Sequence, residues 1–368
     1  MSLVTAPPPT VVRTGGGDRL HVLDLLRFAA AISVLGLHYV ANHPEVWAGR
    51  AGAFGPATGV LTYGWLGVET FFVISGFVIC MSSWGRPLSH LFISRVSRLM
   101  PAYMAAVLIT ATVITLMPMG RPKPHISHTL VNLTMLQRFL HVPATDAVSW
   151  TLFIELKFYV LFAIVVAFGV TYRRVVLFCV LWSIAALFAV YQDEPLLTAI
   201  VEPRTTALFV AGVVLYLIHR FGADLLLWCM LGVSVAVELA NLAQRAEIRT
   251  GFASYPIAMV LMLSVFALMT GVALGWFDWV RWPGLVTLGA LTYPVYLLHH
   301  EIGLITIQRL SPTGIHPWLL FTLVVAAVLL LSHAVAKLVE RPLSRALRHG
   351  LAAGFATIRA ADARPPRG

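Results

Sequence analysis

Charged side chains are scarce in this sequence, and their scarcity excludes most soluble classes of protein. Only 11% of the 368 residues are charged, whereas 59% are hydrophobic, and the mean hydropathy is +0.84. A soluble domain carries about 25% charged residues, because its surface faces water. This chain has less than half of that fraction, too few charged side chains to cover the surface of a soluble protein. The composition therefore predicts a protein that crosses a membrane several times.

Cysteine is scarce as well. Cys80, Cys179 and Cys229 lie in apolar runs, far apart and without the spacing of metal ligands. They favour neither a disulfide framework nor a zinc site. The formal net charge of +10 could suggest a nucleic-acid partner, but the membrane topology described next accounts for it. We therefore expect no nucleic-acid partner.

Long apolar runs account for most of the chain. Most of them reach the ~20 residues that span a ~30 Å hydrocarbon core. They cover residues 20–41, 60–84, 99–119, 149–170, 175–191, 198–218, 224–243, 254–275, 284–305 and 317–339. The sequence therefore predicts an all-α, polytopic membrane protein with about ten transmembrane helices.

The chain divides into three parts on this basis. Residues 1–19 are rich in Pro, Gly and Thr and are predicted to form a flexible tail. Residues 20–340 form the transmembrane domain, and residues 341–368 form a basic tail of low complexity. Segments predicted to face inward hold about twice as many basic residues as the outer loops, which predicts that both termini are cytoplasmic. The protein is expected in the cytoplasmic membrane.

Ionisable residues inside the first predicted helix are candidates for function, because charge in a membrane is costly. Asp24 and Arg27 are one turn apart and could neutralise each other. Arg27 and His38 share one face, three turns or about 16 Å apart. The same positions have an explanation that involves no function, in which Arg27 extends its side chain to the inner interface of the membrane and His38 lies near the outer one.

Three further predicted helices carry ionisable residues at a similar depth. Glu69, Glu155 and the pair His299 and His300 are expected near His38 in the outer third of the membrane. A carboxylate beside an imidazole orients it and raises its basicity, which suits a general base that acts on a hydroxyl. A metal site is the rival hypothesis, but no paired-ligand spacing such as HExxH is present, so we expect none.

A basic motif lies at the opposite, inner face. Arg95 and Arg98 are one turn apart, just before Pro101, which is predicted to start the third helix. Such arginines also satisfy the positive-inside rule on their own. Two guanidinium groups on one helical face can bind phosphates bidentately, and Arg27 at the same depth adds a third. A polyanionic donor at the inner face and an imidazole base at the outer face would allow a transfer route through the membrane.

Several segments together resemble the membrane-bound acyltransferase 3 family, which includes O-antigen, exopolysaccharide and nodulation-factor acetyltransferases and macrolide acyltransferases. They are LDLLRFAAAISVLGLHY at 23–39, GVETFFVISGFVI at 67–79, FISRVSRLMPAY at 92–103, SWTLFIELKFYVLF at 149–162, EPRTTALFVAG at 202–212, LGALTYPVYLLHH at 288–300 and VERP at 339–342. They occur in the family's order and cover nearly all of residues 20–342. Many family members carry a further hydrolase-like domain after the last helix, where this sequence has the basic tail.

The resemblance implies roles for individual residues. His38 would be catalytic, Arg27, Arg95 and Arg98 would bind the coenzyme A moiety, and Glu155 would belong to the essential polar set. Glu69 stands where the family has an acidic residue. Further residues in family motifs are possible lining of the site: Trp150, Tyr159, Arg204, Tyr293, Tyr296 and His299. Acyl-CoA would be a co-substrate, with no permanently bound cofactor.

The leading hypothesis is an acyl-CoA-dependent O-acyltransferase that moves an acyl group, most simply acetyl, to a hydroxyl of a glycan, a glycolipid or a glycosylated small molecule. His38, oriented by Glu69 or Glu155, would take the proton of that hydroxyl, or would carry the acyl group covalently. The alternative is a proton-coupled membrane transporter or channel without covalent chemistry, which inverted repeats or broken helices would favour. The two halves show no repeat, and Pro101 and Pro203 stand at predicted helix starts.

Overall fold

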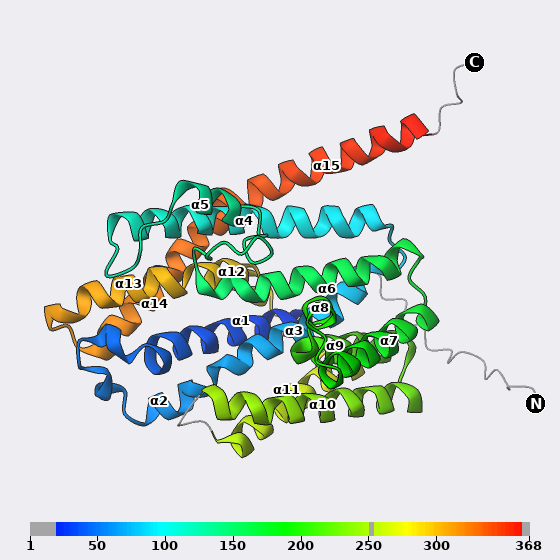
Figure 1. Cartoon of the computed structure of the whole chain (residues 1–368), viewed down its shortest axis with the longest axis horizontal. Coiled ribbons are helices and arrows are strands. Elements are labelled where there is room, and N and C mark those ends of the chain that lie inside the picture. The colour runs from blue at the N-terminus through cyan, green and yellow to red at the C-terminus, as the bar shows by residue number, and fades with distance from the viewer. Residues whose placement is uncertain (1–19, 250–253, 363–368) are drawn as a thin grey trace, which may run out of the picture.

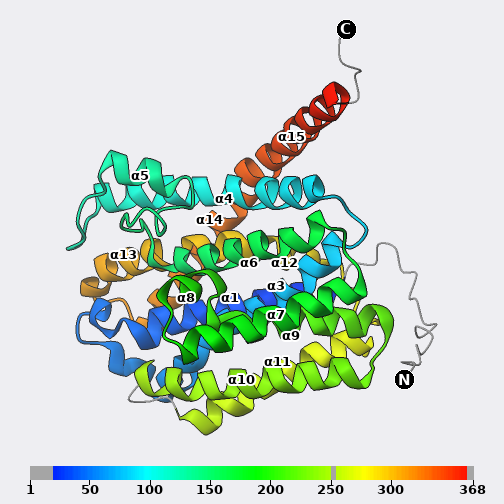
Figure 2. The same cartoon turned by 45° about the vertical axis from the view of Figure 1, so that its right-hand side comes forward.

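The structure is a computed structural model that describes residues 20–249 and 254–362. Within these ranges every regular element is helical, which confirms the predicted all-α class. The predicted tail at residues 1–19 and the last residues of the C-terminal tail, 363–368, lie outside the described part. Most of the helices run side by side in one bundle, and α15 extends away from it (Figure 1, Figure 2).

Most elements follow one another along the chain with short connections, and a longer one covers residues 133–146. The first half contains α1 (His21–Gly36), η1 (Leu37–Asn42), η2 (Pro44–Trp47), η3 (Ala51–Phe54), α2 (Pro56–Leu61), η4 (Thr62–Trp65), α3 (Leu66–Ser83), α4 (Leu88–Leu116), α5 (Ile126–Asn132), η5 (Ala147–Ser149) and α6 (Trp150–Ala167). The second half contains α7 (Tyr172–Tyr191), α8 (Pro195–Val201), α9 (Pro203–Phe221), α10 (Leu225–Arg249), α11 (Tyr255–Leu274), α12 (Gly284–Leu298), α13 (His300–Leu310), η6 (Ser311–Thr313), α14 (Pro317–Val335), η7 (Ala336–Glu340) and α15 (Arg341–Asp362). Of these, η1 and η7 are π-helical and the other η elements are 3₁₀ turns.

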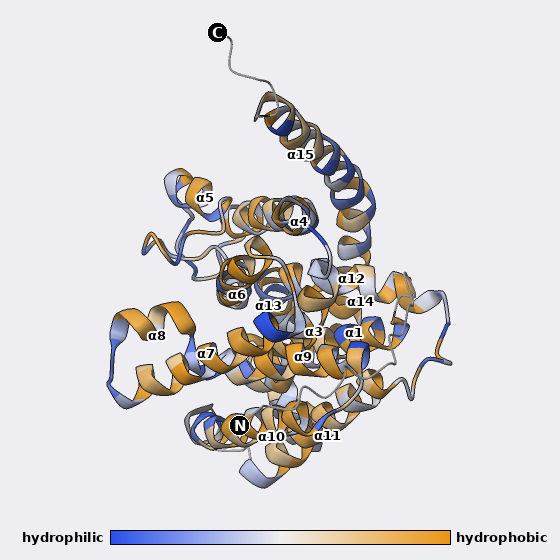
Figure 3. Cartoon of the chain, turned by 90° about the vertical axis from the view of Figure 1, so that its right-hand side faces the viewer, coloured by the Kyte–Doolittle hydropathy of each residue, from blue (hydrophilic) through white to orange (hydrophobic). Residues whose placement is uncertain are grey.

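Helices long and apolar enough to cross a membrane number nine in the described part of the chain, so this is a multi-pass membrane protein. The tenth predicted span, 284–305, is divided: α12 ends at Leu298, and α13 begins at His300 after a bend. Pro294 inside α12 removes one backbone hydrogen-bond donor, which weakens the helix just before this bend. Hydrophobic residues dominate the bundle, whereas α15 mixes hydrophilic with hydrophobic residues (Figure 3).

The predicted start of the third helix at Pro101 is wrong. Pro101 lies inside α4, which begins at Leu88. A proline inside a membrane helix is tolerated where neighbouring groups satisfy the freed backbone carbonyl. Pro203 does begin a helix, α9, as predicted.

Helices α3 and α9 form the centre of the bundle, and both are buried along most of their length. Two glycines bring their backbones together. A Cβ atom at Gly212 would lie 2.0 Å from the carbonyl oxygen of Val73, and one at Gly76 would lie 2.2 Å from that of Phe209. Small residues at such contacts let membrane helices pack closely. Helices α1 and α6 contact α3, and α10 contacts α9.

The two ends of the described bundle meet at one face. Leu20 and Leu23, at the start of α1, line the same cavity as Arg341 and Arg348, near the start of α15. A chain returns to the face where it started only after an even number of crossings. In the described part of the chain, nine long helices together with α12 supply such a number. That this face is cytoplasmic stays a prediction. We call it the arginine face below, because of the residues described next.

Candidate active site

A cavity rich in arginine opens at the arginine face. Its volume is about 430 Å³, and Arg27 of α1 and Arg95 and Arg98 of α4 line it together. Arg341 and Arg348 of α15 line the same cavity. The sequence placed the first three together, but it assigned the α15 arginines to a basic tail of low complexity outside the transmembrane domain. Only the packing of α15 against α4 shows their place.

A second, narrower cavity of about 90 Å³ continues from the first into the bundle. The two share Arg27, Arg95, Arg98, Gly289 and Tyr293. Predicted site residues that line the narrower cavity include Glu155, Tyr159, Tyr293 and Tyr296. The Glu155 carboxylate accepts a hydrogen bond from the Ser75 hydroxyl. The Arg95 guanidinium lies over the Tyr159 ring, 5.8 Å from its centroid.

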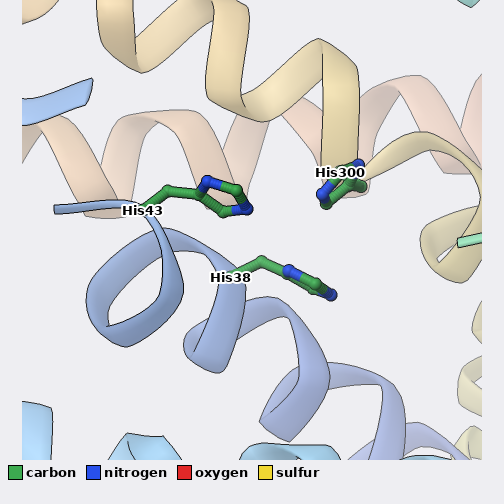
Figure 4. Close-up of side chains that lie close together, drawn as sticks. All are labelled: His38, His43 and His300. Carbon is green, nitrogen blue, oxygen red and sulfur yellow. The ribbon is translucent and has the colours of Figure 1, made fainter. Parts of the chain in front are cut away.

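His38 lies in a cluster of four imidazoles at the other end of α1. It belongs to the π-helical turn η1, an element that is often found at functional sites. Its ring centroid lies 4.5 Å from that of His300, 5.4 Å from that of His299 and 6.0 Å from that of His43. Three of these side chains are shown in Figure 4. His43 was not predicted, because it lies in a loop where no helical periodicity relates it to His38.

Carboxylates that were not predicted contact this cluster, among them Glu301, whose Oε1 lies 3.9 Å from His300 Nδ1. Asp146 Oδ1 lies 2.9 Å from His300 Nδ1, and Glu45 Oε1 lies 2.8 Å from His43 Nδ1. Asp146 and His300 lie outside the nine long apolar helices. Burial alone would raise the pKa of Asp146, but the facing His300 holds it below its ordinary value. Burial alone would lower the pKa of His300, but Asp146 raises it above its ordinary value.

His299 packs deeper in the cluster. Its side chain is fully buried, and its Nδ1 lies 2.9 Å from the Tyr296 carbonyl oxygen. The Tyr39 hydroxyl donates a hydrogen bond to the His299 carbonyl oxygen over 2.6 Å. The predicted neighbourhood of His38 and His299 is therefore present in the structure.

The two predicted carboxylates take other partners. Glu69 forms an ion pair with Arg245 over 2.5 Å, and Arg245 pairs with Glu238 over 2.6 Å. Glu155 faces Ser75 and the narrow cavity instead. Asp146, Glu301 and Glu45 are carboxylates that contact imidazoles of the cluster, and that Glu69 or Glu155 orients His38 stays a prediction. Depth in the membrane does not determine which face of a helix a side chain occupies, and Glu69 points toward α10.

A comparison with protein-family models matches the acyltransferase domain to residues 20–337. The chain belongs to the acyltransferase 3 family. The resemblance predicted from the sequence is thereby confirmed, and the protein is a multi-pass membrane acyltransferase. Membership in an acyltransferase family favours the enzyme hypothesis over the transporter hypothesis. No match was found among curated proteins or among solved structures.

A third cavity in this acyltransferase holds the remaining predicted residues. It measures about 420 Å³, and Trp150 and Arg204 line it together with Glu69, Glu202 and Arg245. Glu202 also pairs with Lys157 over 2.5 Å. Trp150 and Arg204 are therefore grouped with the Glu69 ion pair and not with the arginine cavity.

The arginine cavity and the imidazole cluster of the acyltransferase are connected through two aromatic contacts. Tyr296 lines the narrow cavity, and its ring centroid lies 5.7 Å from that of His299. His299 in turn contacts His38 at 5.4 Å. Ring contacts thus lead from Tyr296, which lines the narrow cavity, to His299 and on to His38.

Proposed function

We propose that this acyltransferase moves an acyl group, most simply acetyl, from acyl-CoA to a hydroxyl of a carbohydrate, a glycolipid or a glycosylated small molecule. One observation carries the proposal: an arginine-lined cavity shares residues with a smaller cavity, and Tyr296, which lines the smaller one, contacts His299 beside His38. This shape suits a donor with a polyanionic head and a long thin arm.

The phosphates of coenzyme A would occupy the wide cavity. Guanidinium groups form bidentate, charge-assisted hydrogen bonds to phosphate oxygens, which are stronger than neutral ones. The cavity offers such groups from α1, α4 and α15, and serine hydroxyls from Ser94, Ser97 and Ser344 line it as well. The pantetheine arm would follow the narrow cavity past Arg27 and Tyr293 toward Tyr296. Its thioester would then lie near His299 and His38.

His38 would act as the general base. The acceptor hydroxyl oxygen attacks the thioester carbonyl carbon while the His38 imidazole takes the hydroxyl proton. The carbon–sulfur bond then breaks, and the departing coenzyme A thiolate takes that proton back. A two-step route through an acyl-imidazole on His38 uses the same groups. His300, held by Asp146, packs against the His38 ring at 4.5 Å and is a positioning residue in this scheme.

The proposal is tested by acyl-CoA turnover of purified protein in nanodiscs, with radiolabelled acetyl-CoA and a pooled extract of glycans and small glycosides. We expect label in an acceptor for the wild type and a loss of at least about 100-fold for His38→Ala, the usual scale for a general base. Binding of acetyl-CoA should persist in that variant. His333→Ala, at an exposed position on α14, serves as the matched control. Absence of acetyl-CoA binding and turnover in the wild type, or full activity of His38→Ala, would overturn the proposal.

A further inference from the structure

Three of the imidazoles beside the proposed site converge in a way that acyl transfer does not require. One ring nitrogen each of His38, His43 and His300 lie within 4.8 Å of one another. Figure 4 shows the three rings around one common space, with His38 and His43 on one segment and His300 on another. Among the described residues, it is the one group of three or more His, Cys, Asp or Glu side chains whose possible ligand atoms lie this close together. The sequence spacing alone gave no sign of it.

The hydrogen bonds around the cluster are those of metal-binding histidines. A metal-bound imidazole almost always has its other ring nitrogen on a carboxylate, a carbonyl or a water. His300 Nδ1 contacts Asp146 and His43 Nδ1 contacts Glu45, so both rings present Nε2 for a ligand. The two carboxylates also supply the negative charge that a divalent cation needs in a partly buried place.

The ligand set selects the class of metal. Imidazole suits zinc and related transition metals, whereas magnesium and calcium require oxygen ligands. Three histidines with a fourth position left open form a common tetrahedral zinc arrangement, with zinc–nitrogen distances of about 2.0–2.1 Å. The nitrogens must move slightly closer to reach that geometry. His43 lies in the short connection between η1 and η2 and is only half-buried, so its ring has room to turn.

We propose that His38, His43 and His300 bind one Zn²⁺ ion, and that bound zinc inhibits acyl transfer. Zinc on either nitrogen of the His38 ring leaves the proton of the neutral imidazole on the other nitrogen. Such a ring has no lone pair with which to accept the proton of an acceptor hydroxyl. The inhibitory part rests on the proposed function, whereas the metal site itself does not.

Metal binding is measured first, on protein without an affinity tag in nanodiscs. Titration with Zn²⁺ and elemental analysis should give one equivalent per chain. Co²⁺ should give the intense visible absorption of a four-coordinate site.

His43→Asn and His300→Asn should each weaken binding at least about tenfold. His141→Asn is the matched control, because His141 is exposed and has φ 54°, a conformation that asparagine accepts. Stoichiometric binding that His43→Asn leaves unchanged, or no stoichiometric binding by the wild type, would overturn the site.

Inhibition is measured on the same preparations. Zn²⁺ should suppress acetyl-CoA turnover by the wild type and a chelator should restore it, and His43→Asn should need at least about tenfold more Zn²⁺ for the same suppression. Zinc binding with unchanged turnover would overturn the inhibitory part. Zinc binding by a protein that neither binds nor consumes acyl-CoA would support the site and contradict the proposed function instead.

Discussion

At the scale of single residues, buried charges in this protein are matched by specific partners. Arg245 lies between Glu69 and Glu238, and Asp146 lies against His300. Removal of one partner from a buried pair is costly, because the other charge is left in a medium that solvates it poorly. The partners of these residues therefore matter more for their roles than their depth in the membrane.

Asp146 offers a test of this view. Its carboxylate contacts His300 and also accepts hydrogen bonds from the backbone N–H groups of Val148 and Glu301, over 3.1 and 3.2 Å. We expect Asp146→Asn to lower the free energy of unfolding by about 1–3 kcal/mol, the cost of unsatisfied buried polar groups. Thermal unfolding in detergent measures this, and acyl transfer should also slow as His300 loses its orientation.

Glu45→Gln is the control for Asp146→Asn. The Glu45 side chain is 66% exposed, so its replacement should change stability by less than about 0.5 kcal/mol. An unfolding midpoint of Asp146→Asn equal to that of the wild type would show that the buried pair does not stabilise the cluster.

At the scale of elements, close helix contacts determine where the site residues lie. The contact of α3 with α9 depends on Gly76 and Gly212, where backbone approaches backbone. Packing of this kind replaces the hydrophobic effect as the cause of helix association in lipid. Glu69 and Ser75 lie on different faces of α3. The rotation of α3 about its own axis therefore determines that Glu69 contacts Arg245 and Ser75 contacts Glu155.

Gly212→Ala should therefore destabilise the bundle. Its new Cβ would lie 2.0 Å from the Val73 carbonyl oxygen, so the two helices must separate. We expect a loss of about 1–3 kcal/mol, as for other overpacked cores. Gly232→Ala on α10, where no atom lies within 4 Å of the new Cβ, should instead stabilise by about 0.5–1 kcal/mol through helix propensity. Equal unfolding midpoints for the two variants would contradict this account of the interface.

Helix α15 gives a second prediction at this scale. Arg341 and Arg348 line the arginine cavity from α15, whereas Arg345 and Arg359 do not line it. Replacement of Arg341 and Arg348 together by Ala should raise the KM for acyl-CoA at least about tenfold, equivalent to 1.4 kcal/mol, with kcat nearly unchanged. The double replacement of Arg345 and Arg359 by Ala keeps the net charge change equal and should leave KM unchanged. A fall in kcat without a change in KM would contradict phosphate binding by α15.

At the scale of the whole molecule, the arginine cavity and the imidazole cluster lie toward opposite ends of α1. Arg27 near its start lines the cavity, and His38 lies just past its end. Acyl-CoA is made in the cytoplasm, so the proposed route requires the arginine face to be cytoplasmic. The excess of basic residues on the predicted inner loops agrees with that orientation.

Cysteine labelling tests the orientation. In a Cys229→Ser background, Arg86→Cys in the exposed loop before α4 should react with a membrane-impermeant maleimide only after the membrane is permeabilised. His141→Cys in the exposed loop before α6 should react in intact cells. Cys80 and Cys179 are buried and need no replacement. The reverse labelling pattern would place the arginine face outside and exclude cytoplasmic acyl-CoA as the donor in this scheme.

The sequence by itself determined the class of the protein, nearly all of its spans and its family. Apolar runs of the length of a bilayer specify membrane helices directly, because lipid leaves a chain no other way to satisfy its backbone. The motifs around Arg27 and His38 likewise identified the family that the comparison confirms.

Only the tertiary structure decided the partners of these residues. Hydropathy gives the depth of a side chain but not the rotation of its helix or the helix that it faces, so Glu69 and Glu155 were grouped with His38. Asp146 and His43 come from loops, whose positions follow from the packing of the helices that they connect. The arginines of α15 join the cavity because a helix that looked like a polar tail packs against α4.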